Sequence, residues 1–542
     1  MPIEKRDLGL YAGIREEEGG YTLAGKDIQD GLQGIQGNIL SWHNRRNAHY
    51  FFVDFKAAVP AEVRATRHLL RLFAVGADQA DAVSLERLRP LFPEGREIGR
   101  DIADALGGIR LTAEFDLREE YRMARRPPGA PAVSLPGSYF LSVLLTSPGY
   151  AALGFGKNDP VHPRSEAFRQ GMAERKMLRD TGSDGWELLR APAHALIILA
   201  YNPTAREIDR TVKAFRSLLE ICFDRICSEE AGMALESQSV DPDTGKRWFH
   251  DPIGYRDGIS QPLFYQEDTG NRRDREALNR LERGASGRWN PAAALGLVLA
   301  EDPGGGPDAY GSYFVYRKLQ EDLFAFYEMI ENLGVKFQNN RELAFAWIMG
   351  RYPDGTPLAA GALGPARNDF NYRNDKAGAV CPFHAHIRKV NPRSESPIDG
   401  GADVRIVRRA LSFGPILAGR CAPNEGRLEN TLLGETWRRL RDSQEKFGLH
   451  FMCAQSDIEA QFEQIQGGWA NVPRSSNYGN EKDAVIGQPE AEARTIGIPE
   501  AVGDMPSSRS RFALANFVKL LGGAYFFAPS IPFFRNLDGI GS

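Results

Sequence analysis

One stretch of the chain differs in composition from everything around it and divides the sequence in two. From about Gln266 to Gly311 the residues are first densely charged (EDTGNRRDREALNRLERG) and then rich in glycine and proline (EDPGGGPDAYG). Such a composition is typical of a connection rather than of a packed element. Patterns of strands and helices occur on both sides. We therefore expect a peripheral segment (1–30), two α+β halves (31–265 and 311–542) and a connecting segment (266–310).

Short runs of aromatic and branched residues predict strands in both halves. They are NAHYFFVDF (47–55), GSYFLSVLLTS (137–147) and HALIILAY (194–201), then SYFVYRKL (312–319), GLHFMCA (448–454) and GGAYFFAPS (522–530). Two helices are expected, one after Thr204 and one over 320–334 that Gly334 would end. Strands and helices do not alternate strictly, and neither GxGxxG nor a P-loop occurs. This favours an α+β class with antiparallel sheets.

Charge and cysteine usage narrow the class of protein. The 67 basic and 71 acidic residues nearly balance, which gives no reason to expect a nucleic-acid or anionic-membrane partner. No apolar run approaches the roughly 18 residues of a membrane helix. The N-terminal residues lack the pattern of an export signal, so a cytoplasmic location is expected. Five cysteines without CxxC spacing argue against a disulfide framework and a structural zinc site.

Three segments carry residues suited to chemistry. CPFHAHIRKVNPR (381–393) holds His384 and His386, and a neutral imidazole is a common metal ligand. On a strand the two would share a face, and on a helix they would point nearly opposite ways. From these residues alone, a metal ligand and an ordinary histidine both remain open. No HExxH motif occurs, so a hydrolytic zinc site is not expected.

The other two segments contain an acid and a pair of arginines. FHDPIGYRDGISQP (249–262) places Asp257 between Gly254 and Gly258, as in a tight turn against a ligand or in a surface turn. In VRIVRRALSFGP (404–415), a strand would point either Arg408 or Arg409 inward. An inward arginine needs a carboxylate, a propionate or another anion as partner, whereas a surface pair needs none.

Taken together, these segments resemble the dye-decolorising peroxidases, a haem-dependent family. GYRDG matches the GxxDG motif of that family, AHIRKVNPR its segment with the haem-ligating histidine, and IVRRALSFG its segment with the distal arginine. IQGNIL, GSYFVYRKLQED, MGRYPDGTPL, NDFNY and GGAYFFAPS are similar in the same order. The resemblance begins at about Gln29. It implies two ferredoxin-like domains with antiparallel sheets, and haem b in the C-terminal domain beneath the loop that bears Asp257.

The resemblance also implies which residues would hold the haem on its proximal side. His386, which directly precedes Ile-Arg-Lys, would ligate the iron, and His384 would not. Asp457 matches the acid that accepts a hydrogen bond from this ligand in the family, with Glu459 as the alternative. A helix N-cap is the competing interpretation of Asp457. Asn391 and Arg393 match an Asn-Pro-Arg that lies against the haem, with Arg393 a partner for a propionate or a turn residue.

On the opposite side, the resemblance makes Asp257 the base that moves the peroxide proton. Arg408 would stabilise the charge on the leaving oxygen, and Arg409 would face away. Gly258 would let the backbone approach the haem edge. Leu449 and Phe451 would line the pocket from one strand face and limit the entry of water.

Two positions depart from the family pattern. Ala410 stands where many relatives have a glycine and some an asparagine, and Phe413 stands where many have a tyrosine. Electrons from bulky donors would enter through surface tyrosine or tryptophan residues, for which Trp469 and Tyr313 are guesses. The C-terminal FFRNLDGIGS is interpreted as a simple tail or a docking peptide.

The function implied is that of a haem b peroxidase. It would reduce hydrogen peroxide and oxidise phenolic or anthraquinone dyes in one-electron steps. One alternative is a protein that binds, stores or delivers haem, or removes its iron. Another is a haem-free scaffold. Many relatives are dimers or larger, but the sequence does not fix whether this chain forms a homo-oligomer.

Overall fold

The computed structural model describes most of the chain. The described residues are 14–17, 20–23, 31–124, 139–180, 185–189, 191–202, 205–232, 235–240, 247–264, 293, 295–359, 370–393, 404–414, 446–473, 481–488, 494–499 and 507–540. Thr204, the expected helix cap, and most of the connecting segment lie outside them. The predicted division into domains at 266–310 stays a prediction.

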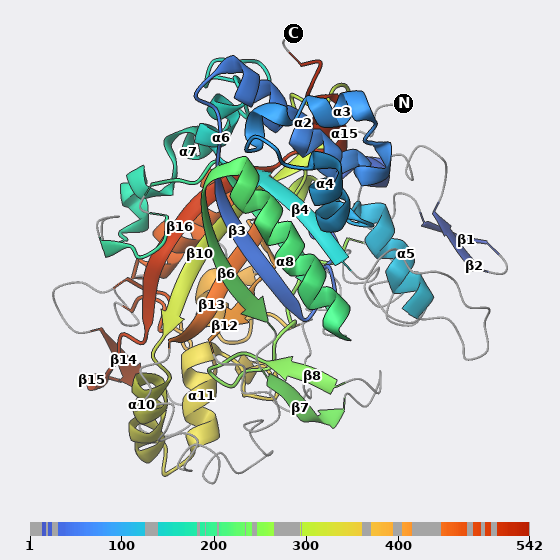
Figure 1. Ribbon diagram of the computed structural model, residues 1–542. Helices are drawn as coiled ribbons and strands as arrows, with labels where there is room; N and C mark the ends of the chain where they lie inside the picture. Colours follow the sequence, from blue (N-terminus) through green and yellow to red (C-terminus); the bar gives the residue numbers. More distant parts are fainter. Residues whose placement is uncertain are drawn as a thin grey trace.

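The first half contains a four-stranded antiparallel sheet in the order β6-β3-β5-β4 (Figure 1). In chain order this is fourth, first, third, second, the order of a ferredoxin-like fold. The strands are β3 (Asn47–Phe55), β4 (Tyr139–Leu145), β5 (Ala195–Tyr201) and β6 (Phe223–Gly232). The helices are α2 (Pro60–Val75), α3 (Ala82–Glu86), α4 (Ile98–Leu106), α5 (Glu114–Ala124), α6 (Ser147–Ala152), α7 (Glu166–Gln170) and α8 (Ala205–Cys222).

The second half repeats this arrangement. Its strands lie in the order β16-β10-β13-β11/β12, which in chain order is again fourth, first, third, second. Its strands are β10 (Tyr310–Glu321), β11 (Val407–Arg408), β12 (Leu411–Phe413), β13 (Phe447–Gln455) and β16 (Val518–Ala528). Its helices are α10 (Leu323–Lys336), α11 (Arg341–Met349), α12 (His386–Val390), the π-helix η10 (Ile458–Ala470) and α15 (Ile531–Asn536). Small hairpins flank both halves: β1 (Ile14–Glu17) with β2 (Gly20–Leu23), β7 (Leu235–Val240) with β8 (Arg247–His250), and β14 (Thr495–Ile498) with β15 (Ser507–Ala513); β9 (Ala300–Glu301) pairs with β10.

The two sheets join at both edges and close into a ring of antiparallel strands. Phe527 of β16 pairs with Leu145 of β4, and Ser412 of β12 pairs with Gly232 of β6. The α+β class with two ferredoxin-like units is therefore confirmed. What the sequence pattern did not reveal is that the halves share one continuous sheet.

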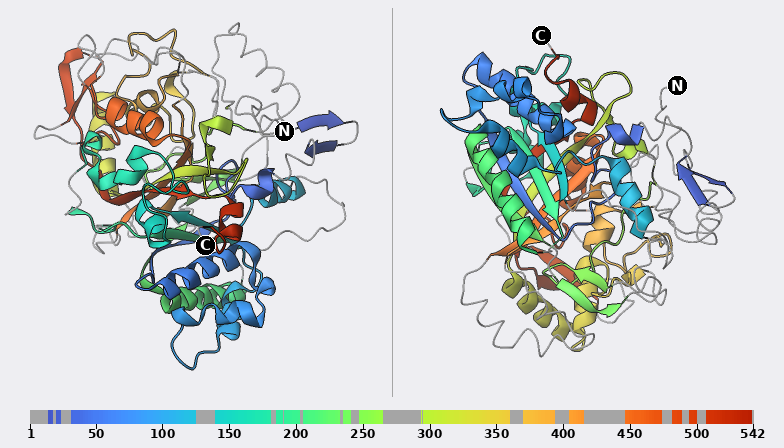
Figure 2. Two further views of the ribbon diagram at one scale, coloured as in Figure 1. Left: turned by 90° about the horizontal axis from the view of Figure 1, so that it is seen from above. Right: turned by 45° about the vertical axis from the view of Figure 1, so that its right-hand side comes forward.

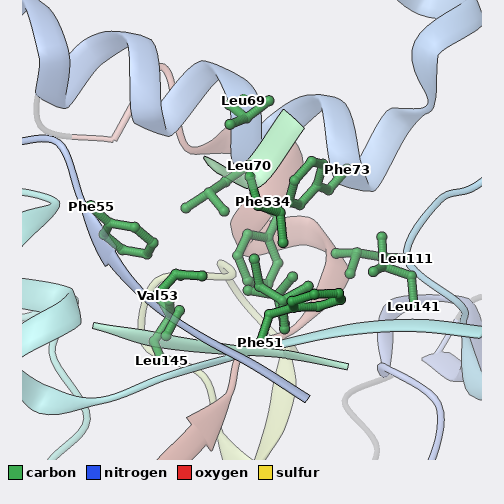
Figure 3. Packing of buried hydrophobic residues seen from close by; sticks show 14 of the residues in the cluster. Phe51, Val53, Phe55, Leu69, Leu70, Phe73, Leu111, Leu141, Leu145 and Phe534 are labelled. Atoms are coloured by element: carbon green, nitrogen blue, oxygen red, sulfur yellow. The ribbon is translucent and has the colours of Figure 1, made fainter. Parts of the chain in front are cut away.

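The alternation of side chains on β3 builds two cores, one on each face of the sheet. Phe51, Val53 and Phe55 pack against α2 (Figure 3), and Tyr50 and Phe52 point into the ring of strands. A third cluster lies around α10 and α11. Every predicted strand has its counterpart, and the predicted strand at 47–55 coincides with β3.

Gly334 does not end its helix as expected, because α10 continues to Lys336. A Cβ at Gly334 would lie 3.1 Å from the side chain of Arg341, so the glycine allows α11 to approach closely.

The C-terminal residues are neither a simple tail nor a free docking peptide up to Ile540. Helix α15 packs against α2 in the first half (Figure 2), and Phe533, Phe534 and Leu537 are fully buried there. The tail therefore completes the N-terminal core. None of the helices described is long and apolar enough to cross a membrane.

Candidate active site

A cavity of about 590 Å³ opens between the sheet of the second half and the loops below it. It is lined by the β13 and β10 faces, the loop after β8, α12 and the segment 485–488. Of these elements, β13 and β8 are labelled in the lower half of Figure 1. Eight of the predicted site residues line this cavity although they come from four separate segments: Asp257, Gly258, His386, Asn391, Arg393, Arg408, Leu449 and Phe451.

The structure distinguishes the two histidines. His386 is the first residue of α12, its side chain is 22% exposed, and it lines the cavity. Its Nδ1 lies 3.0 Å from Oδ2 of Asp483, so Nε2 is the ring nitrogen left for a ligand. His384 is fully buried, and its Nδ1 lies 2.7 Å from Oε2 of Glu481. His384 does not line the cavity, which agrees with its interpretation as a non-ligand.

The prediction that Asp457 or Glu459 contacts His386 is wrong. Asp457 caps η10, since its Oδ1 accepts a hydrogen bond from the amide of Ala460 at 2.8 Å. Glu459 accepts hydrogen bonds from Ser165 and from the amide of Ala167. Asp457 directly precedes η10, and Glu459 lies in its first turn. The competing interpretation of Asp457 as an N-cap is therefore correct.

Asp483 is the residue that the sequence interpretation missed. Its carboxylate also accepts hydrogen bonds from the amides of Val485 (2.8 Å) and Ile486 (2.9 Å). Burial raises the pKa of Asp483, but His386 and the two amides more than offset this and leave it below its ordinary value. The one available signal was spacing, because Glu481 and Asp483 are two residues apart, as are the histidines that they contact.

The other wall of the cavity is formed by the loop that follows β8. The Asp257 amide donates to the carbonyl of Phe249 at 2.8 Å, and its Oδ1 accepts from the amide of Gly258 at 2.6 Å. Gly258 has φ of +79°, a conformation that favours glycine. The local turn therefore fixes the Asp257 side chain at the edge of the cavity, where it is exposed.

Arg408 is held against this loop. Its backbone amide donates to Oε1 of Gln261 at 3.1 Å, and its guanidinium donates to the carbonyl of Ile259. Burial lowers the pKa of Arg408, and the charges of Asp257 and Asp251 oppose this shift. Arg409 is also among the residues that line the cavity, but its guanidinium donates to the carbonyls of Asn38 and Ile39.

Strand β13 lies over the cavity with its apolar side. Leu449 and Phe451 line the cavity, while His450 between them points to the opposite face. There Nδ1 of His450 lies 2.8 Å from the hydroxyl of Tyr316. Burial lowers the pKa of His450 to about 3, so this histidine is neutral. Ala410 also lines the cavity and offers no side-chain donor.

Buried arginines gather at one end of the cavity. Arg393 donates to the carbonyl of Phe370 and stacks on its ring at 3.9 Å. Arg351, in the MGRYPDGTPL segment, donates to Ser260 and to the carbonyl of Gly355. Burial, and then the charge of Arg393, lower the pKa of Arg351 to about 9. Two cations held this close suit an anionic ligand with more than one carboxylate.

The donor set around His386 fits haem better than a metal ion held by protein alone. Among the residues described, no group of three or more His, Cys, Asp or Glu side chains could hold a metal ion. One imidazole oriented by a carboxylate, an apolar wall and arginines at one end match a flat, anionic metallo-macrocycle. A cavity of this size accommodates one large ligand.

Trp469 and Tyr313, the guessed surface residues for electron entry, are both buried, at 9% and 7% exposure. Trp469 lies on η10 and Tyr313 in the core beside Phe527. Trp42 lines the cavity instead and is half-buried.

Similar proteins have one activity in common. The chain is 34% identical over 464 residues to the multifunctional dye peroxidase DyP2 of Amycolatopsis sp., covering 81% of this chain and 89% of that protein. The crystal structure of an Anabaena sp. DyP-type peroxidase superposes with a TM-score of 0.69 at 28% identity, covering 94% and 95% of the two chains. A dye-decolorizing peroxidase in complex with 2,6-dimethoxyphenol shares the fold, with a TM-score of 0.60, 19% identity and coverage of 94% and 99%. No protein-family model matches the chain.

Proposed function

The chain belongs to the dye-decolorising peroxidase family, and from this premise we propose how its own residues carry out the reaction. The protein is a hydrogen-peroxide-dependent oxidoreductase that oxidises bulky organic dyes. Nothing in the comparisons favours a haem carrier. The proposal concerns the cofactor, the residues that hold it and the residues that move protons and stabilise charge.

Haem b is proposed to occupy the cavity, where His386 would hold its iron through Nε2. The contact from Nδ1 to Asp483 fixes the ring and makes Nε2 more basic. Arg351 and Arg393 are the proposed partners of the propionates, and Asn391 and Gly258, which also line the cavity, would lie against the macrocycle. When bound, haem supplies an iron that accepts peroxide and stores its two oxidising equivalents.

On the open side, Asp257 is proposed to take the proton from one peroxide oxygen and return it to the other. Arg408 stabilises the negative charge that develops on the departing oxygen. Fixed donors of this kind contribute about 3–4 kcal/mol to a transition state. The side chain of Ala410 offers no amide, so we assign these two steps to Asp257 and Arg408. Leu449 and Phe451 keep water away, which strengthens the interaction of Arg408 with that charge.

The donors are proposed to be phenols and anthraquinone dyes. The complex of a related fold with 2,6-dimethoxyphenol supports a phenolic class. The cavity is the proposed haem site, and we propose that bulky dyes bind outside it. The electrons would therefore arrive through the protein from donors bound outside.

The observation that carries the proposal is that Asp257, Arg408 and the carboxylate-bound His386 line one cavity. Replacing Arg408 with leucine tests it. We expect the R408L variant to bind haem, as judged by its Soret band, and to lose about 100–1,000-fold in dye oxidation. His386→Ala is the paired variant and should lose the haem itself. Dye oxidation by R408L at the wild-type rate would contradict the assignment, and wild-type protein with haem but no turnover would favour a carrier.

A further inference from the structure

A tyrosine and a histidine are hydrogen-bonded directly behind the wall of the cavity. His450 lies on β13 between Leu449 and Phe451, which line the cavity, and its own side chain points to the opposite face of the sheet. Tyr316 lies on the neighbouring strand β10 (Figure 1), and its hydroxyl lies 2.8 Å from Nδ1 of His450. Both side chains are fully buried. The proposed function assigns no part to either of them.

The direction of this hydrogen bond follows from the other nitrogen of the imidazole. Nε2 of His450 lies 3.2 Å from the carbonyl of Glu230, and a carbonyl can only accept a hydrogen bond. Nε2 therefore carries a proton. Burial lowers the pKa of His450 and keeps the ring neutral, which leaves Nδ1 without a proton. The Tyr316 hydroxyl consequently donates to a nitrogen that can take up its proton.

Two other buried tyrosines show that this arrangement is not a general result of burial. The ring centroids of Tyr150 and His162 are 5.2 Å apart, but the Tyr150 hydroxyl has no hydrogen-bond partner among the residues described. Tyr255 donates at 2.9 Å to the carbonyl of Phe345, which cannot take a proton. A tyrosine beside a histidine is therefore not sufficient, and the printed contact in Tyr316 is what distinguishes it.

Aromatic and charged side chains lead from the pair toward the surface. The half-buried ring of Phe413 on β12 lies 5.0 Å from the ring of His450. Nζ of Lys318 lies 5.0 Å from the same Phe413 ring. Lys318 is itself paired with Glu229 at 2.7 Å, and this reduces the repulsion between its charge and a positive imidazole. The pair thus joins the strand that walls the cavity to a ring that solvent partly reaches.

We propose that Tyr316 passes electrons from outside donors to the cavity and that His450 accepts its proton in each transfer. The inference rests on the proposed function, in which peroxide leaves two oxidising equivalents in the cavity and dyes bind outside it. The side chain of Tyr316 lies on the far face of the sheet from the cavity, so an electron has one sheet to cross.

Each transfer is balanced in atoms and electrons. Tyr316 gives one electron toward the cavity, its O–H bond breaks, and the proton forms an N–H bond at Nδ1 of His450. Nε2 keeps its contact with the Glu230 carbonyl, which stabilises the positive ring. A dye at the surface then gives one electron to the phenoxyl radical, and Nδ1 returns the proton to the oxygen. Two such transfers consume both oxidising equivalents and leave the pair unchanged.

Burial makes the proton acceptor necessary. An oxidised tyrosine that keeps its proton is a cation, and an isolated cation in an apolar core is strongly disfavoured. Proton transfer across the 2.8 Å contact leaves the tyrosine neutral and moves the charge to an imidazole that already has a carbonyl partner. Tyr150 has no acceptor of this kind, so we expect Tyr316 to be oxidised more readily than Tyr150.

The first test needs neither haem nor turnover. A ruthenium polypyridine photo-oxidant is coupled to the thiol of Cys227, an exposed cysteine on β6 three residues before Glu230. Cys421, which lies outside the described residues, is replaced by serine in every sample. After a flash, we expect the absorption band of a phenoxyl radical with equal amplitude in the wild type and in the matched control Tyr150→Phe. Tyr316→Phe should lose this band.

His450→Gln separates proton transfer from packing, because glutamine can accept the hydrogen bond of Tyr316 but is not a base. The radical should form about 100-fold more slowly in this variant, the lower end of what a positioned base contributes. In the haem-loaded protein, Tyr316→Phe and His450→Gln should keep the Soret band and the rate of the spectral change caused by one equivalent of peroxide. Their dye oxidation should fall by about the same factor, whereas Tyr150→Phe should match the wild type.

Several outcomes would overturn the proposal. Equal phenoxyl bands in Tyr316→Phe and Tyr150→Phe would do so, as would equal dye oxidation by these two variants. Radical formation at the wild-type rate in His450→Gln would overturn the transfer of the proton to His450. A slower response of Tyr316→Phe to peroxide would place the tyrosine in peroxide cleavage instead. Failure of the proposed function differs, since absent haem or an active R408L variant would leave the flash experiment unchanged.

Discussion

The contact between His386 and Asp483 leads to a quantitative prediction for Asp483→Asn. In the wild type, Oδ1 of Asp483 accepts from the amides of Val485 and Ile486, and Oδ2 lies 3.0 Å from Nδ1 of His386. An asparagine keeps its oxygen toward the two amides and turns its NH₂ toward His386. Two donors then face each other unless the imidazole moves its proton to Nε2, the nitrogen that the iron needs.

Loss of such a partner typically lowers metal affinity about 10–100-fold, or about 1.4–2.7 kcal/mol. We expect Asp483→Asn to weaken haem binding by this factor. The assay is a titration of the haem-free variant with hemin, followed at the Soret band in competition with a second haem-binding protein. A positive shift of the reduction potential should accompany the loss, because a less basic imidazole stabilises the higher oxidation state less.

Two controls make the result decisive. Glu481→Gln alters the neighbouring pair with His384 and should leave haem affinity close to the wild type. Asp457→Asn tests the position that family resemblance favoured, and should change neither haem affinity nor potential. Unaltered haem affinity and potential in Asp483→Asn would refute the reasoning, as would a loss of haem affinity in Asp457→Asn equal to that expected for Asp483→Asn.

Three further predictions concern stability and pH. Because the pKa of Asp251 is raised to about 7, the folded state holds a proton between about pH 4 and pH 7 that the unfolded chain releases. The free energy of unfolding of the haem-free protein should therefore fall as the pH rises through this range, by at most about 1.4 kcal/mol per pH unit. Asp251→Asn should flatten this pH profile in denaturant unfolding. Phe534→Ala should destabilise the protein by about 3–5 kcal/mol in denaturant unfolding, since this side chain of the C-terminal helix is fully buried in the N-terminal core, and a loss below 1 kcal/mol would contradict that packing. Oδ2 of Asp538 lies 2.8 Å from Nδ1 of His68. Burial raises the pKa of Asp538, but His68 and nearby arginines lower it by more, so the pKa is below its ordinary value. Asp538→Asn should therefore lower the melting temperature at pH 7, and this difference from the wild type should disappear as the pH falls below about 4.

The sequence by itself determined the elements and the residues that belong to contiguous motifs. The strand NAHYFFVDF became β3 because its alternation suits burial on both faces of a sheet. The conformation of GYRDG depends on a glycine at positive φ within the motif, and that of IVRRALSFG on a short strand. Because both are local, Asp257 and Arg408 could be identified from the sequence. In the same way, the resemblance singled out His386 rather than His384.

Only the tertiary structure decided which segments meet. Asp483 is 97 residues from His386 in the chain. Family resemblance indicates Asp457 instead, but the carboxylate of Asp457 caps the N-terminus of a helix. The raised pKa of Asp251 comes from its burial in the folded protein, which no local pattern reveals. Secondary structure follows from interactions between near neighbours in the chain, whereas the partner and the pKa of a side chain depend on burial and on contacts made when distant segments pack together.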